Sequence, residues 1–204
     1  DAGRWGVWGG VELSRPQATH VDRLFGFVEE TRRRCTHCQG PVQAWYSSQR
    51  VLRVSPFASR GGPCTVTEMY LAGCAGQEEG LRCPQCQRQM MTQRRMHSAA
   101  NVLVVQVRHL PGVSRVPVAA EEQLELPGLP AMELVGVVYH NGATFDSGHY
   151  TCLCRGPGGR FWFYDDDKPA VRVTDEVAHL KTRQVYMLVY CRQDGSASWS
   201  AASS

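Results

Sequence analysis

Two Cys-x-x-Cys pairs, Cys35/Cys38 and Cys83/Cys86, constrain the fold of this chain more than any other feature. A gap of two residues lets both sulfurs of a pair face one ion, and four thiolates at about 2.3 Å form the closed shell of a structural zinc site. The pairs lie far apart in the sequence, so we expect the strand-like residues 42–72 to bring them together. The alternative is that these thiols carry no metal, either simply reduced or acting as a redox couple.

The chain contains nine cysteines in 204 residues, an odd number that would leave one over in a closed set of disulfides. This count favours a reducing, intracellular environment over secretion. We expect the five cysteines outside the two pairs to pack as small hydrophobic side chains. These five are Cys64, Cys74, Cys152, Cys154 and Cys191.

Charge and hydropathy exclude several classes of partner. A formal net charge of +3, from 22 basic and 19 acidic side chains, is too small to indicate a nucleic acid partner. No stretch approaches the ~18 consecutive apolar residues that a membrane-spanning helix requires, and we expect no membrane partner. The composition is near average, which excludes a disordered or collagen-like chain. We expect a monomer located in the cytoplasm, the nucleus or both.

The sequence divides into four segments. Residues 1–17 are rich in Gly and Trp and lack periodicity, so we expect an irregular N-terminal segment. Residues 18–99 indicate interrupted strands that carry the two cysteine pairs, and residues 100–193 indicate a mostly antiparallel sheet. Residues 194–204 form a Ser/Ala-rich tail that we expect to be disordered. Because the first residue is Asp1 rather than Met, we expect an interior piece of a longer chain.

A hairpin is predicted around the connection Gly156-Pro157-Gly158-Gly159, because strand-like stretches flank it on both sides. Counting outward from these four residues places Tyr150 opposite Asp165. His149 then lies close to the Asp165 carboxylate. Such a carboxylate takes the Nδ1–H of the imidazole, fixes the tautomer and leaves Nε2 free as a general base.

Spacing alone also allows a simpler interpretation of these residues. A histidine beside a carboxylate is often an ordinary surface pair, and the three aspartates at 165–167 could be a solvated strand end. We interpret three other histidines, His97, His109 and His140, as surface residues of this kind.

Several stretches of the second half form a recognisable series downstream of the two cysteine pairs. They are residues 102–110 (Val-Leu-Val-Val-Gln-Val-Arg-His-Leu), 134–142 (Leu-Val-Gly-Val-Val-Tyr-His-Asn-Gly), 146–150 (Asp-Ser-Gly-His-Tyr), 161–167 (Phe-Trp-Phe-Tyr-Asp-Asp-Asp) and 185–192 (Val-Tyr-Met-Leu-Val-Tyr-Cys-Arg). In this order they resemble the ubiquitin-specific proteases, which are papain-like cysteine deubiquitinases. The resemblance covers residues 20–193.

The resemblance implies an α+β fold, the papain-like cysteine protease fold of the ubiquitin-specific protease type. Residues 18–99 would form its fingers, with structural Zn²⁺ on the four paired cysteines. Residues 100–193 would form its palm sheet with the histidine box. This chain would then be mainly antiparallel β fingers and palm, with the helical thumb missing.

Site residues follow from the resemblance position by position. His149 resembles the general base, Asp165 the residue that orients it, and Asp166 the acidic residue that follows. Gly148 and Tyr150 would line the channel that receives the Gly-Gly tail of ubiquitin, where a larger side chain than that of glycine would block passage.

One motif of the family, the sequence that carries the nucleophilic cysteine, is missing from this chain. In the family reaction a cysteine thiolate attacks the carbonyl of the C-terminal glycine of ubiquitin in an isopeptide bond. That cysteine lies in a Gly-Asn-Thr-Cys sequence upstream of the zinc knuckles, and none of the nine cysteines here has that context. We therefore expect this chain to be the C-terminal part of a catalytic domain and to be inactive by itself.

Three functions compete on this basis. The first is a deubiquitinating thiol protease whose partners are ubiquitin or ubiquitinated proteins. The alternative is a catalytically inactive ubiquitin-binding scaffold, which the missing cysteine sequence favours. A zinc-stabilised interaction or RNA-binding domain is the third, and the small net charge argues against it.

Overall fold

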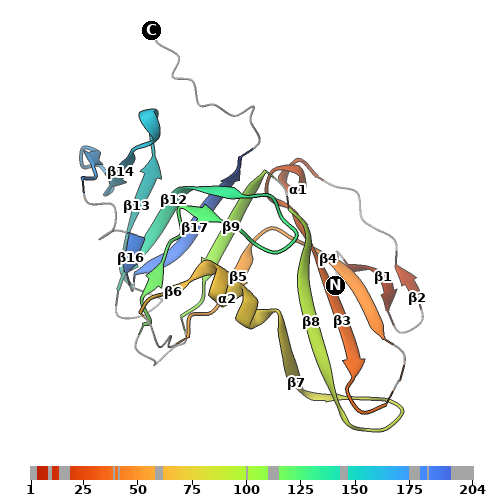
Figure 1. The fold of residues 1–204 in the computed structure, drawn as a ribbon. Helices are drawn as coiled ribbons and strands as arrows, with labels where there is room; N and C mark the ends of the chain where they lie inside the picture. Colours follow the sequence, from red (N-terminus) through yellow and green to blue (C-terminus); the bar gives the residue numbers. More distant parts are fainter. Residues whose placement is uncertain are drawn as a thin grey trace.

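Strands far outnumber helices in this protein, as a computed structural model shows (Figure 1). The strands form two large sheets, named here the finger sheet and the palm sheet, and a small third sheet. The predicted disordered tail, residues 194–204, lies outside the described residues. The structure describes residues 4–8, 11–13, 19–38, 40, 42–57, 62–99, 101–109, 115–142, 147–174, 180–182 and 184–193.

The finger sheet has six strands in the order β2-β1-β4-β3-β8-β7 and extends away from the palm sheet (Figure 1). Its centre is the antiparallel set β4-β3-β8, in which β3 pairs along its whole length with β8. The strands are β1 (Arg4–Trp8), β2 (Val11–Leu13), β3 (Phe27–Cys35), β4 (Gln43–Gln49), β7 (Ala75–Arg82) and β8 (Gln89–Ala99).

The N-terminal segment contributes strands to this sheet, so the expectation that residues 1–17 are irregular is wrong for β1 and β2. β1 pairs antiparallel with β4, with Trp5 opposite Tyr46. A strand whose partner lies far along the chain is stabilised by that pairing rather than by its own pattern. Residues 1–17 are rich in Gly and Trp and show no sustained alternation of apolar and polar residues, so their pattern alone does not predict a strand.

The palm sheet has eight strands, in the order β15-β14-β13-β12-β17-β9-β5, with β11 pairing alongside β12. All of its pairs are antiparallel except β5 with β9. The strands are β5 (Leu52–Val54), β9 (Val102–Val107), β11 (Gln123–Leu124), β12 (Met132–Asn141), β13 (His149–Arg155), β14 (Phe161–Tyr164), β15 (Val171–Arg172) and β17 (Val185–Arg192).

Side chains that alternate along these strands divide the palm sheet into two faces. In β9 every second residue is buried, and the buried set is Leu103, Val105 and Val107. Leu153 of β13 and Leu188 of β17 are fully buried and belong to the same hydrophobic core. Because apolar side chains recur at a period of two, this face packs against other elements, and we call it the core face.

Helix α2 (Val66–Gly73) and the third sheet pack on the core face (Figure 1). The α2 side chains Val66, Met69 and Tyr70 join the palm core. Sheet β16-β10-β6 adds further buried residues, among them Val118. Its strands are β6 (Cys64–Thr65), β10 (Val118–Ala119) and β16 (Lys181–Thr182).

Helices α1 and α2 each begin with a capping box, which explains where they start. The Thr65 side chain accepts a hydrogen bond from the Glu68 backbone N–H, and Glu68 accepts one from the Thr65 backbone. Thr19 and Asp22 do the same for α1 (His20–Phe25). No helix among the described residues is long and apolar enough to cross a membrane; α2 has eight residues.

The predicted hairpin is present, but its register differs from the expected one by one residue. β13 and β14 are joined by the short 3₁₀ turn η1 (Pro157–Gly159). The Gly156 N–H donates to the Arg160 carbonyl at 2.8 Å, so these two residues pair and the connection has three residues rather than four. Arg155 therefore lies opposite Phe161, and counting onward places Asp165 opposite Thr151 instead of Tyr150.

The two faces of β13 predict opposite responses to truncation. Leu153→Ala removes a fully buried side chain and is expected to lower the free energy of unfolding by about 2–5 kcal/mol. Cys152→Ala, its neighbour on the other face, is expected to cost less than about 1 kcal/mol. Urea denaturation of both variants measures this, and equal losses would contradict the assignment of the core face.

Candidate functional site

The two cysteine pairs meet at the far end of the finger sheet. β3 ends at Cys35, which lies opposite Met90 of β8, and this pairing brings the residues before β8 to the end of β3. The sulfurs of Cys35 and Cys86 are 3.5 Å apart, as are those of Cys38 and Cys83. All four sulfurs lie within 4.8 Å of one another. We call these four residues the cysteine cluster.

Backbone amides point at the sulfurs of the cluster, as expected for a knuckle that holds thiolates. The N–H groups of Cys38 and His37 donate to Cys35 Sγ at 3.5 and 3.4 Å. These bonds lower the pKa of Cys35 to about 6, because they stabilise its anion. The amides of Cys86 and Gln85 likewise lower the pKa of Cys83. The neighbouring sulfurs of Cys86 and Cys83 raise the pKa of Cys38 instead, as expected for thiols packed this closely. The sulfur spacing and the lowered pKa values of Cys35 and Cys83 fit a tetrahedral metal site, and His37 takes part through its backbone.

The second group of predicted site residues lies at the edge of the palm sheet. His149, the first residue of β13, places Nε2 at 2.5 Å from Asp165 Oδ1. Its Nδ1 is 3.7 Å from Asp166 Oδ2. The expectation that Asp165 accepts a hydrogen bond from Nδ1 is therefore wrong. With Nε2 donating to the carboxylate, Nδ1 is the nitrogen left to act as a base.

A tight turn after β14 holds the two aspartates beside the imidazole. The Lys168 N–H donates to the Asp165 carbonyl at 3.1 Å and closes the turn. Within it, Asp166 has a φ of +49°, a left-handed conformation that Asp tolerates better than most residues. The backbone thus turns back at Asp165, directly after the strand ends.

Lys168 is a neighbour of this site that the sequence analysis missed. Its Nζ donates to Asp165 Oδ2 at 2.6 Å, while Oδ1 faces His149. The hydrogen bond from Lys168, with a smaller contribution from His149, lowers the pKa of Asp165 and keeps its carboxylate charged. One available signal was composition: Lys168 and Lys181 are the only lysines among 22 basic residues.

His140 belongs to β12, lies opposite Tyr150 of β13 and is buried. Its interpretation as a surface histidine is therefore wrong. Arg115 donates to the His140 carbonyl at 2.6 Å and to its Nδ1 at 3.0 Å. The His140 ring packs against Tyr150, with centroids 4.6 Å apart. His109 is buried too, with Nε2 at 3.1 Å from the Val185 carbonyl, whereas His97 is exposed beside Tyr46.

Gly148 lies where a side chain does not fit. A Cβ added there would stand 2.4 Å from His140 Nε2 and 2.9 Å from the Asn141 carbonyl oxygen. Contacts this short force the neighbouring atoms to move. The backbone before His149 therefore passes directly over the buried His140 ring, and this close approach sets where β13 begins.

Comparison with known proteins identifies the family. The model of the family described as ubiquitin carboxyl-terminal hydrolase matches residues 10–190. The chain belongs to the ubiquitin carboxyl-terminal hydrolase family. This confirms the resemblance to the ubiquitin-specific proteases, which are cysteine proteases.

Curated relatives of this hydrolase family match most of the chain. Probable ubiquitin carboxyl-terminal hydrolase 16 of Schizosaccharomyces pombe is 24% identical over 87% of this chain. Ubiquitin carboxyl-terminal hydrolase 17-like protein B of Mus musculus is 25% identical over 90% of it. The chain spans 41% of the length of each of these two relatives.

Solved structures confirm the expected fold. A yeast SAGA DUB module with a mutant Sgf73 matches with a TM-score of 0.69 and 22% identity, over 85% of this chain and 42% of that one. A SAGA DUB module of Ubp8, Sgf11, Sus1 and Sgf73 bound to monoubiquitin matches with a TM-score of 0.68 and 21% identity, over the same shares. The mostly β fold is thus that of a ubiquitin-specific protease.

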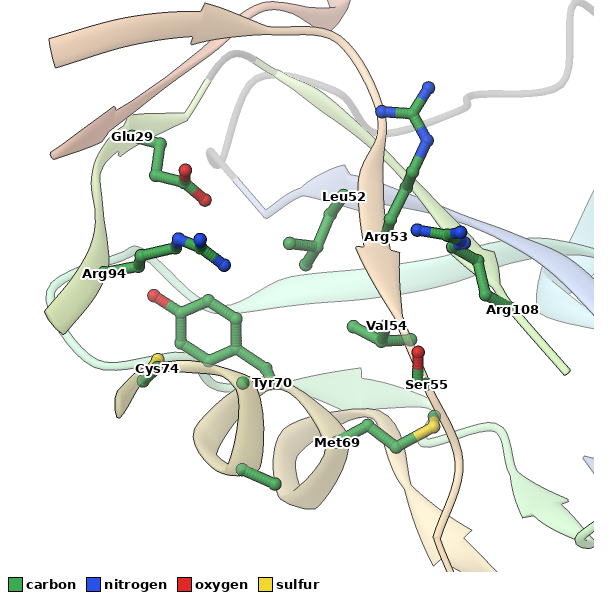
Figure 2. Close-up of a pocket in the computed structure, with 12 residues that line it drawn as sticks. Glu29, Leu52, Arg53, Val54, Ser55, Met69, Tyr70, Cys74, Arg94 and Arg108 are labelled. Carbon is green, nitrogen blue, oxygen red and sulfur yellow. The ribbon is translucent and has the colours of Figure 1, made fainter. Parts of the chain in front are cut away.

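A cavity of about 370 Å³ lies between the finger and palm sheets of this hydrolase-family chain (Figure 2). Figure 2 shows Glu29 and Arg94 at one end and Arg108 near β5 at the other. Burial raises the pKa of Glu29, and Arg94 opposes this shift. The predicted site residues are absent from the described lining, which is Glu29, Leu52, Arg53, Val54, Ser55, Met69, Tyr70, Ala72, Gly73, Cys74, Arg94 and Arg108.

The close approach at Gly148 gives a test of the site geometry. Gly148→Ala is expected to displace the start of β13 and to lower the free energy of unfolding by about 1–3 kcal/mol. Gly136→Ala in β12 is the matched control, because its Cβ would meet atoms no closer than 3.5 Å. Denaturation and the backbone NMR shift of His149 measure both effects. A Gly148→Ala chain that matches the control would contradict the packing of Gly148 on His140.

Proposed function

We propose that this chain supplies the general base and the zinc-bearing fingers of a deubiquitinating thiol protease. The single observation that carries the proposal is the His149–Asp165 contact of 2.5 Å in a chain of the ubiquitin carboxyl-terminal hydrolase family. The substrate would be ubiquitin joined through its C-terminal glycine to a lysine amine. The relatives and the structure bound to monoubiquitin support this choice of substrate.

The proposed chemistry uses the two nitrogens of His149 in different ways. Nε2–H donates to Asp165, which fixes the tautomer and stabilises the imidazolium. Nδ1 takes the proton of a cysteine thiol, and the resulting thiolate attacks the carbonyl carbon of the terminal glycine. The imidazolium returns this proton to the departing lysine amine, which leaves a thioester. Water, deprotonated by the same imidazole, then hydrolyses the thioester and restores the thiol.

The attacking cysteine is proposed to come from outside the nine of this chain. Four of the nine form the cysteine cluster. Burial raises the pKa of Cys64, Cys74 and Cys191, and raises that of Cys154 to about 11, which disfavours the nucleophilic thiolate. The ninth, Cys152, has its sulfur 3.9 Å from that of Cys154, and within the described part of the chain no hydrogen bond joins a cysteine sulfur to His149. Nucleophile and base would thus lie on separate segments, and the site would be complete only in a longer protein.

Tyr150 and Gly148 keep their proposed place beside the ubiquitin tail. Tyr150 is exposed although it is aromatic, with 47% of its surface accessible, and it follows His149 directly. Exposed aromatic side chains are favoured at sites of protein contact. Gly148 directly precedes His149, so an extended peptide that reaches the imidazole would run along the Gly148 backbone.

Turnover of a fluorogenic ubiquitin C-terminal amide tests this function in a protein that contains this chain and the remaining catalytic segment. His149→Ala is expected to abolish turnover, by about 10³-fold or more, because it removes the base. His97→Ala, an exposed histidine outside the site, is the control. Ubiquitin affinity is expected to change little in either variant. Turnover by His149→Ala near the wild-type rate would reject the assignment, and ubiquitin binding without any turnover would favour the scaffold.

We further propose that the cysteine cluster binds one structural Zn²⁺. Cys35, Cys38, Cys83 and Cys86 would hold it, and four thiolates favour zinc over harder cations. Bound zinc would join the end of β3 to the segment before β8 and so stabilise the tip of the finger sheet. Its role is structural, because four protein ligands leave no open position for substrate.

Removing one ligand tests the metal site. Purified chain is expected to contain one zinc ion per molecule, and Cys83→Ser is expected to lose it together with several kcal/mol of stability, because metal binding is coupled to folding. Cys152→Ser, outside the cluster, is expected to retain the metal. Metal analysis by mass spectrometry measures both, and wild-type chain purified without zinc would contradict this part of the proposal.

A further inference from the structure

The Asp165 carboxylate is shared between two side chains. Oδ1 faces His149 Nε2 at 2.5 Å, and Oδ2 accepts from Lys168 Nζ at 2.6 Å. A carboxylate held at one oxygen only can rotate about its last torsion, which has a broad minimum. With both oxygens engaged, this rotation would break two charge-assisted hydrogen bonds. The bond from Lys168 to Oδ2 therefore restricts the direction in which Oδ1 can face His149.

We propose that Lys168 is a positioning residue, which holds the Asp165 carboxylate so that Oδ1 stays on His149 Nε2. This rests on the proposed function, since it assigns a further residue to the same site. Lys168 does not touch the reacting atoms in this assignment. It acts through Asp165 on the tautomer and orientation of the imidazole.

The turn after β14 places Lys168 beside Asp165, three residues earlier in the chain. The backbone bond from Lys168 N–H to the Asp165 carbonyl brings the lysine side chain back over the aspartate three residues earlier. Lys168 is 68% exposed, so packing does not hold its side chain, and the carboxylate is its partner. Asp165 is only 20% exposed, so water is partly excluded from the bond that Lys168 supports.

Removing Lys168 would strengthen the His149–Asp165 bond if Lys168 acted only through its charge, and would weaken it if Lys168 positions the carboxylate. The ammonium of Lys168 neutralises part of the Asp165 charge, so removing it would strengthen the attraction between Asp165 and an imidazolium. If Lys168 positions the carboxylate, removing it loosens the His149–Asp165 bond despite this gain. The charged groups around the pair in the described residues are His149, Asp166 and Lys168 itself. The two effects therefore have opposite signs and can be separated.

Imidazole ¹⁵N shifts of this chain test the positioning without any need for turnover. At a pH where His149 is neutral, wild-type chain is expected to show a single tautomer with the proton on Nε2. Lys168→Met is expected to shift His149 toward a mixture of tautomers, and Lys168→Arg is expected to restore the single form. Arg50→Met removes an exposed cation from its ion pair with Asp22, outside the site, and is the charge-matched control. An unchanged or more uniform Nε2–H tautomer in Lys168→Met would overturn the proposal.

Steady-state kinetics of a protein that contains this chain and the remaining catalytic segment give a second test of the role of Lys168. Lys168→Met is expected to lower kcat about tenfold with KM changed less than about twofold, because positioning acts on the reacting geometry rather than on substrate binding. Lys168→Arg is expected to recover most of the loss, and Arg50→Met to leave both constants unchanged. Equal kcat in Lys168→Met and wild type would overturn the assignment. If the wild-type protein shows no turnover, the proposed function fails, and the ¹⁵N shifts alone decide the role of Lys168.

Discussion

The pairing of β13 with its two neighbours is the constraint on which the site depends. On one side, His149 lies opposite Asn141 of β12 and its neighbour Tyr150 lies opposite the buried His140, so the imidazole stands at the end of this pairing. On the other side, the pairing with β14 ends at Tyr164, so the chain turns at Asp165 and returns its carboxylate to His149. A shift of one residue in either pairing would move the alternate side chains to the opposite face and separate the imidazole from the carboxylate.

The cysteine cluster depends on a different and independent pairing. β3 and β8 bring the two Cys-x-x-Cys pairs to the same end of the finger sheet, although the pairs are distant in sequence. The two parts of the chain meet through the palm core, in which Phe27 and Met96 of the finger strands pack with palm residues such as Val105. The fingers therefore reach out from a shared core rather than forming a separate unit.

Features of the fold and the site that depend on residue spacing follow from the sequence. The cysteine pairs predicted the cluster, and the Gly/Pro connection predicted the hairpin that joins His149 and Asp165. The hairpin register, the orientation of the imidazole and the burial of His140 do not follow from spacing, for physical reasons. The register shifted because Gly156 pairs with Arg160, and the imidazole presents Nε2 to Asp165, which depends on rotation of a side chain. His140 is buried where its ring meets Tyr150 and Arg115, partners from other segments of the chain that its own sequence pattern does not reveal.

The proposed mechanism requires a nucleophilic cysteine outside the nine of this chain. A ubiquitin probe with a C-terminal electrophile, reacted with a protein that contains this chain, forms a covalent bond to the attacking thiol, and peptide mass spectrometry identifies the labelled residue. A single adduct is expected on a cysteine outside residues 1–204, and His149→Ala is expected to abolish it. An adduct on one of the nine cysteines of this chain, or an adduct whose formation does not depend on His149, would contradict it.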